Sequence, residues 1–275
     1  MTDTSTDLVR NPDNSFTLTL TASITDIDQS RQEVLQNHQQ SFQKDGFRPG
    51  KAPLSMVEES IPLTHLIEDV ASSVFSKLYG QKIKDYQLKP IIPPKISFQT
   101  PPIDLVHEWQ ASLTSCELPP HTLDPLYQAD IKSLNAQGPT GESAPQSDKD
   151  GKVAKYYDIL IKYSHCDLPE ILLETEIQHR LSGLIDQTSQ AGLTVDQYLR
   201  SKNTTLEQYR QQLASRVTQD WKINQSISLI AQEQNIQVSQ EELNSLKAKN
   251  HNLSNPNILY FVLLEQKVVS FLSSL

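Results

Sequence analysis

Residues 16–24 of the chain read Phe-Thr-Leu-Thr-Leu-Thr-Ala-Ser-Ile, and this stretch decides the class of the first domain. Apolar and hydroxyl-bearing side chains alternate through it. Because successive side chains of a strand point to opposite faces, this period of two is typical of a half-buried β-strand. We therefore expect a sheet whose apolar face covers a core.

Two helices and further strands are expected after this strand. Apolar residues at every third or fourth position predict a helix over 30–43 and a longer one over 61–79. Pro62 suits the first turn of the longer helix. Alternation returns over 105–113 and predicts another strand. The order β-α-α-β-β over residues 1–126 makes a small α+β domain.

The distribution of proline predicts a different structure for the second half. The chain has 16 prolines, of which only Pro169 and Pro256 follow residue 150. Since proline is excluded from helix interiors, residues 153–275 are expected to form an all-α domain. The stretch 127–152 is rich in Gly, Pro, Ser and Gln, and it predicts a linker between the two domains.

Several helix starts in the second half can be located in the sequence. Pro169 suits the start of one helix, and Asn255 followed by Pro256 suits the start of the last. That last helix is apolar on almost all sides, so it is either buried or presents apolar surface to a partner. Capping-box spacing marks three further starts: Thr194 with Gln197, Thr204 with Glu207, and Ser239 with Glu242.

Composition excludes several classes of protein. The formal net charge is −9, from 24 Lys and Arg against 33 Asp and Glu, which argues against a protein that wraps nucleic acid. The cysteines, Cys116 and Cys166, have neither disulfide-framework nor metal-ligand spacing. No apolar run is long enough to span a bilayer, and the first residues lack a secretory pattern. These features predict a cytoplasmic protein that does not act at a membrane.

A search for catalytic chemistry finds almost nothing. The sequence has no dinucleotide fingerprint, P-loop, nucleophile elbow or HExxH zinc motif. His165 and Cys166 are adjacent, but adjacency in sequence does not make a catalytic pair. We therefore expect no metal, no cofactor and no catalytic residue.

The segment 44–53 is the strongest candidate for a binding site. It reads Lys-Asp-Gly-Phe-Arg-Pro-Gly-Lys-Ala-Pro and carries a net charge of +2 within an acidic domain. Glycine permits positive φ and proline fixes φ, so a defined loop with Phe47 at its tip is predicted. An exposed aromatic beside an arginine is a frequent binding hot spot. In the alternative interpretation, the segment is an ordinary turn and Phe47 packs into its own domain.

The pattern G-F-R-x-G-K-x-P in this segment, after a strand and a helix, resembles the signature of trigger factor, the ribosome-associated bacterial chaperone. In that family the loop docks on a ribosomal protein beside the exit tunnel, and the Phe-Arg-Lys stretch makes the contact. Pro49 stands where many members have a basic residue. The resemblance thus implies a ribosome-binding site made by Gly46, Phe47, Arg48, Pro49, Gly50 and Lys51.

A second resemblance lies in the C-terminal half. The segments 167–177, 192–199 and 235–243 resemble helix starts of the trigger factor C-terminal domain. Similar helices occur in periplasmic chaperones of the SurA type, so the order of the two halves is the more specific observation. Family members usually carry an FK506-binding-type prolyl isomerase domain between these halves. Here only residues 127–152 lie there, with Tyr127 as their one aromatic, so the resemblance implies a trigger factor without that domain.

The resemblance implies an ATP-independent chaperone that docks at the ribosome and shields nascent polypeptides during folding and export. Its expected partners are a ribosomal protein at the tunnel exit, unfolded nascent chains and a second copy of itself. Direct recognition of nucleic acid is not expected. The alternatives are a ribosome-independent holdase or assembly factor that does not use the loop, and residual prolyl isomerase activity.

Overall fold

The computed structural model describes residues 7–44, 46–48, 50–136, 146–249 and 255–275. The chain forms two compact units, Met1–Leu118 and Pro119–Leu275, which are considered separately here. The first is α+β and the second is helical except for a small two-stranded sheet. The predicted fold class is therefore confirmed. The boundary between the units falls at Leu118, somewhat before the predicted end of the first domain.

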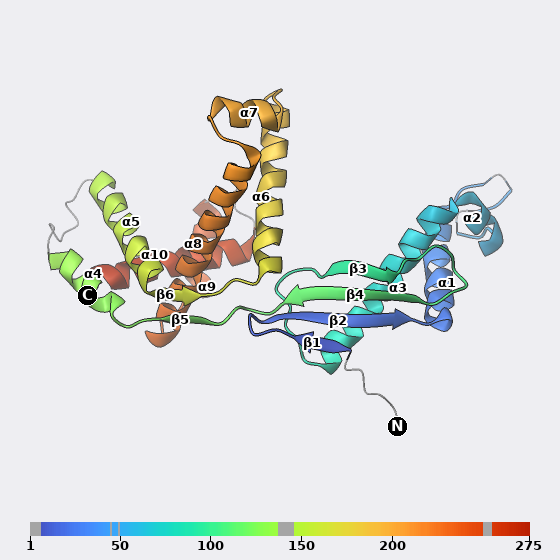
Figure 1. Cartoon of the computed structure of the whole chain (residues 1–275), viewed down its shortest axis with the longest axis horizontal. Helices are drawn as coiled ribbons and strands as arrows, with labels where there is room; N and C mark the ends of the chain where they lie inside the picture. Colours follow the sequence, from blue (N-terminus) through green and yellow to red (C-terminus); the bar gives the residue numbers. More distant parts are fainter. Residues whose placement is uncertain (1–6, 45, 49, 137–145, 250–254) are drawn as a thin grey trace. The chain divides into compact units, whose positions relative to one another are not determined.

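The first unit contains a four-stranded antiparallel sheet and three helices (Figure 1). The strand order in the sheet is β1-β2-β4-β3, and α3 packs against β2. The elements in chain order are β1 (Leu8–Arg10), β2 (Ser15–Ala22), α1 (Ile24–Ser41), α2 (Leu54–Ser60), α3 (Leu63–Asp85), β3 (Lys95–Thr100) and β4 (Trp109–Cys116).

Strand β2 confirms the period of two that predicted it. Phe16, Leu18 and Leu20 are buried, and the antiparallel register places Leu18 opposite Leu113 of β4. The strand ends at Ala22, two residues earlier than the alternation suggested. Ser23 instead caps α1, because its hydroxyl accepts the backbone N–H of Asp26 while the Asp26 carboxylate accepts the N–H of Ser23. The first helix therefore begins at Ile24 rather than at residue 30.

One continuous hydrophobic core holds the first unit together. It joins the inner faces of β2 and β4 to buried residues of α1, α2 and α3. Trp109 is buried at the start of β4, and its indole N–H donates to the carbonyl of Asp104. The predicted strand over 105–113 thus begins four residues late. Pro62 occupies the N-cap position before α3, and the short helix α2 was not predicted.

The second unit is built from helices and a two-stranded sheet in which His121 pairs with Cys166. Most of its buried apolar residues fall into two separate clusters, one around α4, α5, α8 and α10 and one between α6 and α8. The elements are β5 (His121–Leu123), α4 (Tyr127–Ala136), α5 (Gln146–Tyr163), β6 (Ser164–Cys166), α6 (Glu170–Gln190), α7 (Val195–Ser201), α8 (Leu206–Glu233), α9 (Gln240–Lys249) and α10 (Pro256–Ser274).

The stretch 127–152 is not simply a linker. Its first ten residues form α4, in which Tyr127 and Ile131 are buried in the core of the second unit. The amide of Asn135 donates to the carbonyl of Leu272 at 2.8 Å and accepts the hydroxyl of Tyr156 at 2.6 Å. The prediction of a linker is wrong for these residues, because their i, i+4 apolar spacing outweighs the Gly- and Pro-rich composition that follows. Residues 137–145 lie outside the described part of the chain.

Most of the predicted helix starts are confirmed. The capping boxes at Thr194 and Ser239 are present with both reciprocal hydrogen bonds. The third box uses Thr205 with Gln208 rather than Thr204 with Glu207. Asn255 caps α10, with Pro256 in its first turn.

Helix α10 both fills the core and reaches the surface. Leu259, Leu264, Val268 and Leu272 are buried, whereas Ile258 and Tyr260 are 49% and 42% exposed. Among the described residues, no helix is both long and apolar enough to cross a bilayer.

Candidate functional site

The candidate loop connects α1 to α2, and both helices lie at the same end of the first unit (Figure 1). The helix α1 ends where the backbone N–H of Phe42 donates to the carbonyl of Gln39 at 3.2 Å. Phe42 packs against the core as the chain leaves the helix. The chain returns to the core at Ala52, which is 1% exposed. The loop is therefore anchored in the core at both ends.

The two glycines give the loop its shape, as the sequence predicted. Gly46 has φ +89° and Gly50 has φ +77°. Residues with a Cβ rarely adopt this region of backbone conformation. Two turn hydrogen bonds accompany them: Phe47 N–H donates to the Lys44 carbonyl at 3.1 Å, and Lys51 N–H donates to the Arg48 carbonyl at 3.0 Å. A Cβ built on Gly46 meets nothing within 4 Å, so backbone conformation rather than space requires glycine there.

The loop presents its aromatic and basic side chains to solvent. Phe47 is 40% exposed, and Arg48 and Lys51 are exposed as well. Neither cation forms a salt bridge with any residue that the structure describes. The alternative in which Phe47 packs into its own domain is therefore not what the structure shows. Pro49 lies outside the described residues.

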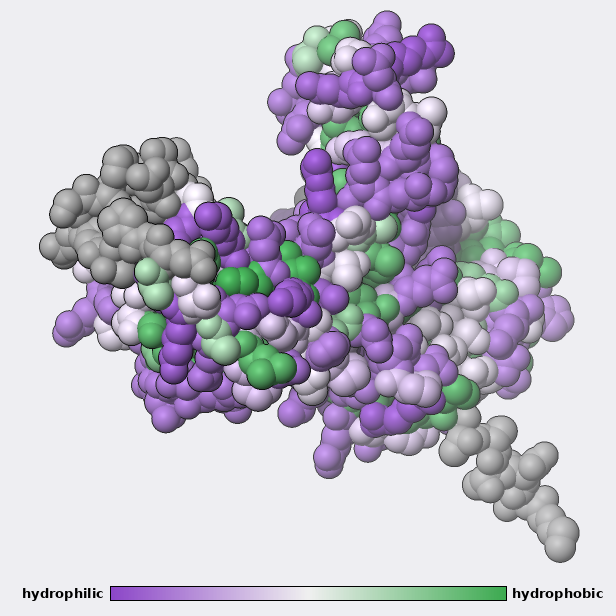
Figure 2. Space-filling model, turned by 60° about the vertical axis from the view of Figure 1, so that its left-hand side comes forward, coloured by the Kyte–Doolittle hydropathy of each residue, from purple (hydrophilic) through white to green (hydrophobic). Residues whose placement is uncertain are grey.

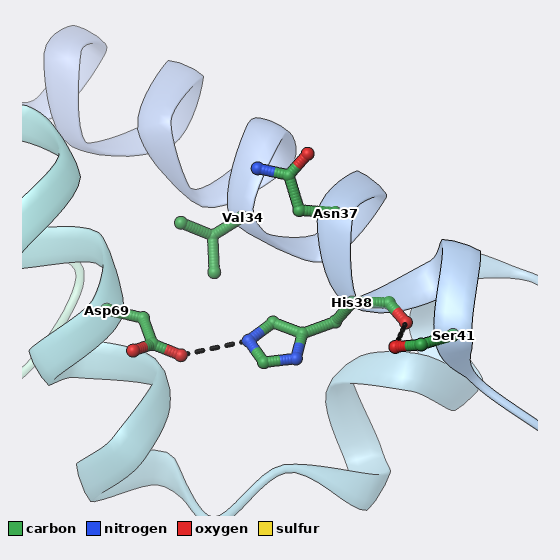
Figure 3. A pocket seen from close by; sticks show the side chains of 5 residues that line it. All are labelled: Val34, Asn37, His38, Ser41 and Asp69. Atoms are coloured by element: carbon green, nitrogen blue, oxygen red, sulfur yellow. Dashed lines mark hydrogen bonds and ion pairs between the residues drawn. The ribbon is translucent and has the colours of Figure 1, made fainter. Parts of the chain in front are cut away.

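Beside the loop, a shallow pocket lies between the end of α1 and α3 (Figure 3). It encloses about 390 Å³ and is lined by Val34, Asn37, His38, Ser41 and Asp69. The imidazole Nε2 of His38 lies 2.9 Å from a carboxylate oxygen of Asp69, and both side chains are more than 40% exposed. The hydroxyl of Ser41 donates to the carbonyl of His38 rather than to its ring. The pocket thus lacks the contact by which a histidine would activate a serine nucleophile.

The two cysteines are buried rather than reactive. Burial raises the pKa of the Cys116 thiol to about 11 and also raises the pKa of Cys166. A raised pKa keeps the thiol protonated at neutral pH, and the thiolate is the reactive form. His165 is exposed, whereas the adjacent Cys166 is buried, so the structure gives no support to a catalytic pair. Within the described residues, no group of three His, Cys, Asp or Glu side chains could hold a metal ion.

Sequence reasoning missed the contacts that fix the base of the loop. The guanidinium of Arg31 in α1 forms an ion pair with Glu58 in α2. The side-chain amide of Gln39 donates to the carbonyl of Ala52 at 2.6 Å. Both contacts join α1 to the chain beyond the loop. No spacing rule predicts either of them, because the partners are 27 and 13 residues apart.

The sequence matches two family descriptions in succession. Residues 5–135 match "Bacterial trigger factor protein (TF)", and residues 144–250 match "Bacterial trigger factor protein (TF) C-terminus". Only residues 136–143 separate the two matches, so no FK506-binding-type domain stands between them.

Individual relatives match over shorter segments. The trigger factor of Fusobacterium nucleatum subsp. nucleatum is 33% identical over 92 residues, which are 34% of this chain and 21% of that protein. The trigger factor of Agathobacter rectalis is 29% identical over 86 residues, which are 31% of this chain and 19% of that protein. The chain therefore aligns with about a fifth of the length of these curated relatives.

A solved structure shares the fold along almost the whole chain. It is described as "Promiscuous Substrate Recognition in Folding and Assembly Activities of the Trigger Factor Chaperone". The TM-score is 0.60 at 13% sequence identity, and the match covers 97% of this chain and 98% of that one. Since the N-terminal and C-terminal family matches together cover most of the sequence, in the order that their descriptions state, this chain belongs to the trigger factor family.

Proposed function

We propose that this chain is a cytoplasmic chaperone that docks on the ribosome through the loop 46–51 and shields nascent polypeptides without using a nucleotide. The observation that carries this proposal is the loop itself. It presents an exposed Phe47 beside an exposed Arg48 on a backbone shaped by two glycines of positive φ. An exposed aromatic beside a cation suits a partner that offers an apolar pocket rimmed by acidic groups. In this proposal that partner is a ribosomal protein beside the tunnel exit.

The second unit is proposed as the part that holds clients. Figure 2 shows hydrophobic surface dispersed in several places among hydrophilic surface. Unfolded chains expose short apolar segments, which such a surface binds weakly and reversibly. Attachment at the ribosome raises the local concentration of clients, so weak contacts suffice. The large apolar side chains exposed in this unit include Leu126, Ile185, Leu193, Leu206, Ile258 and Tyr260.

Co-sedimentation with bacterial ribosomes at several salt concentrations tests the docking step. The wild type is compared with a variant carrying Phe47→Ala and Arg48→Ala. A matched control carries Phe98→Ala and Lys95→Ala on the exposed strand β3, where Phe98 is also 40% exposed. We expect the wild type and the control to pellet with ribosomes and the loop variant to remain in solution. Equal pelleting of all three proteins would contradict docking by the loop.

A ribosome-independent holdase is the second candidate, because the exposed apolar residues of the second unit do not depend on the loop. Suppression of aggregation of a chemically denatured client, measured by light scattering without ribosomes, tests this activity. If the wild type never pellets with ribosomes but the wild type and the loop variant suppress aggregation equally, this second function replaces the first.

A further inference from the structure

The described residues of the loop, 43–44, 46–48 and 50–51, form few backbone hydrogen bonds that would hold the loop in one arrangement. Its two turn hydrogen bonds are local, since one joins Lys44 to Phe47 and the other joins Arg48 to Lys51. Neither of them links the arm that leaves α1 to the arm that returns at Ala52. A loop of nine residues with free arms would lose much conformational entropy on binding, and that loss weakens affinity.

Gln39, in the last turn of α1, contacts both ends of this loop. Its backbone carbonyl accepts the N–H of Phe42, where the chain leaves the helix. Its side-chain amide donates to the carbonyl of Ala52, where the chain returns, over 2.6 Å. The carbonyl of Ala52 can only accept, so the amide nitrogen of Gln39 must be the atom that faces it. Arg31 also donates to Glu58 across the loop, but Glu58 lies six residues beyond Ala52, whereas Gln39 contacts the residue at which the chain returns.

The residues around the hydrogen bond between Gln39 and Ala52 are well packed. Phe42 packs against the core, and the side chain of Ala52 is buried within it. The return arm also runs close to α1, because a Cβ built on Gly50 would lie 3.9 Å from the Cα of Gln40. The contact between Gln39 and Ala52 is itself partly buried, which limits competition from water.

We propose that Gln39 is a positioning residue of the docking loop: it holds the two arms together, so that Phe47 and Arg48 are presented in one arrangement before the partner binds. The effect of Gln39 on ribosome affinity rests on the proposed docking function. The effect of Gln39 on the order of the loop does not depend on that function. Gln39 need not touch the partner, since it acts through the backbone at Phe42 and Ala52.

The test uses the full-length chain with Gln39→Met, which keeps the length of the side chain and its helix propensity but removes the donor. Gln36→Met makes the same replacement at an exposed position one turn earlier in α1 and serves as the matched control. Hydrogen–deuterium exchange of peptides covering 42–53 measures the order of the loop. Titration with ribosomes measures the affinity of each variant, beside the variant carrying Phe47→Ala and Arg48→Ala.

We expect Gln39→Met to speed exchange in the loop peptides while peptides of α3 remain unchanged. Ribosome affinity should fall by about fivefold, the equivalent of one ordinary hydrogen bond. Gln36→Met should change neither quantity. Unchanged loop exchange in Gln39→Met would overturn the inference.

Two further outcomes separate this inference from the proposed function. If the loop variant loses ribosome binding but Gln39→Met binds like the wild type, docking stands and the positioning role is refuted. If the wild type itself does not bind ribosomes, the docking proposal fails together with the predicted effect on affinity. The exchange measurement then still decides whether Gln39 orders the loop.

Discussion

The first and second units bury their apolar residues in different ways. In the first unit, one cluster of buried residues runs from the sheet through α1, α2 and α3. In the second unit, most of the buried apolar residues fall into two clusters, and α8 contributes residues to both of them. The smaller cluster contains Ile177, Leu213 and Val217. The ion pair between Arg210 and Glu174 adds a contact between α6 and α8 there, but an exposed pair contributes little.

This difference suits the two roles proposed for the units. A single continuous core is rigid, so a loop anchored in it at Phe42 and Ala52 begins and ends at fixed positions. A divided core allows one part to open while the other stays folded. Client polypeptides vary in sequence and size, so a unit that opens in parts can adapt to them at low cost.

The largest expected effect is the destabilisation of the whole first unit by one core substitution. Phe16→Ala removes a buried ring from the single cluster and should lower the free energy of unfolding of this unit by about 3–5 kcal/mol. Urea denaturation followed by Trp109 fluorescence measures it in a Trp221→Phe background. Thr19→Ala, on the opposite face of the same strand, should cost less than about 1 kcal/mol. If Phe16→Ala only speeds amide hydrogen exchange in β2 and does not shift the urea midpoint, the core is not one cooperative cluster.

A pair of substitutions on α8 tests whether the core of the second unit is divided. Leu213→Ala should destabilise the α6–α8 cluster by about 2 kcal/mol, the low end for such a cavity. Hydrogen exchange should then speed up in α6 and α7 but not in α5 and α10. Ile230→Ala, in the other cluster, should produce the reverse pattern. If both variants speed exchange throughout the unit, its core behaves as one cluster and the contrast with the first unit disappears.

The smallest expected effect is the pH-dependent contribution of Glu242, in α9, to the stability of the second unit. A hydrogen bond from Lys267, with a further one from the backbone N–H of Ser239, lowers the pKa of Glu242 from 4.5 to about 2. A carboxyl group with a lowered folded-state pKa stabilises the fold above pH 4.5 and loses that contribution as the pH falls toward 2. Glu242→Gln should therefore lower the urea midpoint of the second unit at pH 6, and the difference from the wild type should shrink below pH 4.5.

The matched control for this variant is Glu241→Gln, which removes the same charge one residue earlier, outside the ion pair with Lys267. Trp221 fluorescence in a Trp109→Phe background reports the second unit alone. A difference between Glu242→Gln and the wild type that stays constant from pH 6 to pH 3 would refute the role of this carboxylate.

Much of the fold could be predicted where the sequence pattern extends over several residues. Strand β2 and the helices α3, α6 and α8 show their periods plainly, since each buries a regular set of apolar side chains. The strands β1, β5 and β6 have three residues each, which is too short for a period to be seen. The error at Ile24 has a similar cause, because the alternation continues by chance into a helix that Ser23 has already capped.

The candidate site shows the same limit. The positive φ of Gly46 and Gly50 could be predicted, because glycine in a short loop between two helices commonly provides the left-handed backbone conformation that a turn requires. The contact of Gln39 with Ala52 could not, because an amide in a helix has many partners within reach and only the folded chain selects one. Arg48 and Lys51 make no salt bridge with the described residues. This also could not be predicted, because it depends on where the fold places the carboxylates of α2 and α3.

The register of the sheet has a consequence for the order in which the chain is made. Strand β2 pairs with β4 along its whole length, and Ala22 lies opposite Trp109. A ribosome adds roughly 5–20 residues per second, so β2 waits roughly 4–17 s for its partner. During that time β1 can pair with β2, and the helices α1 and α3 can form, but the edge of β2 that later pairs with β4 has no partner. The first unit of this protein thus passes through a stage with an open strand edge, which is the same aggregation hazard from which it is proposed to protect other chains.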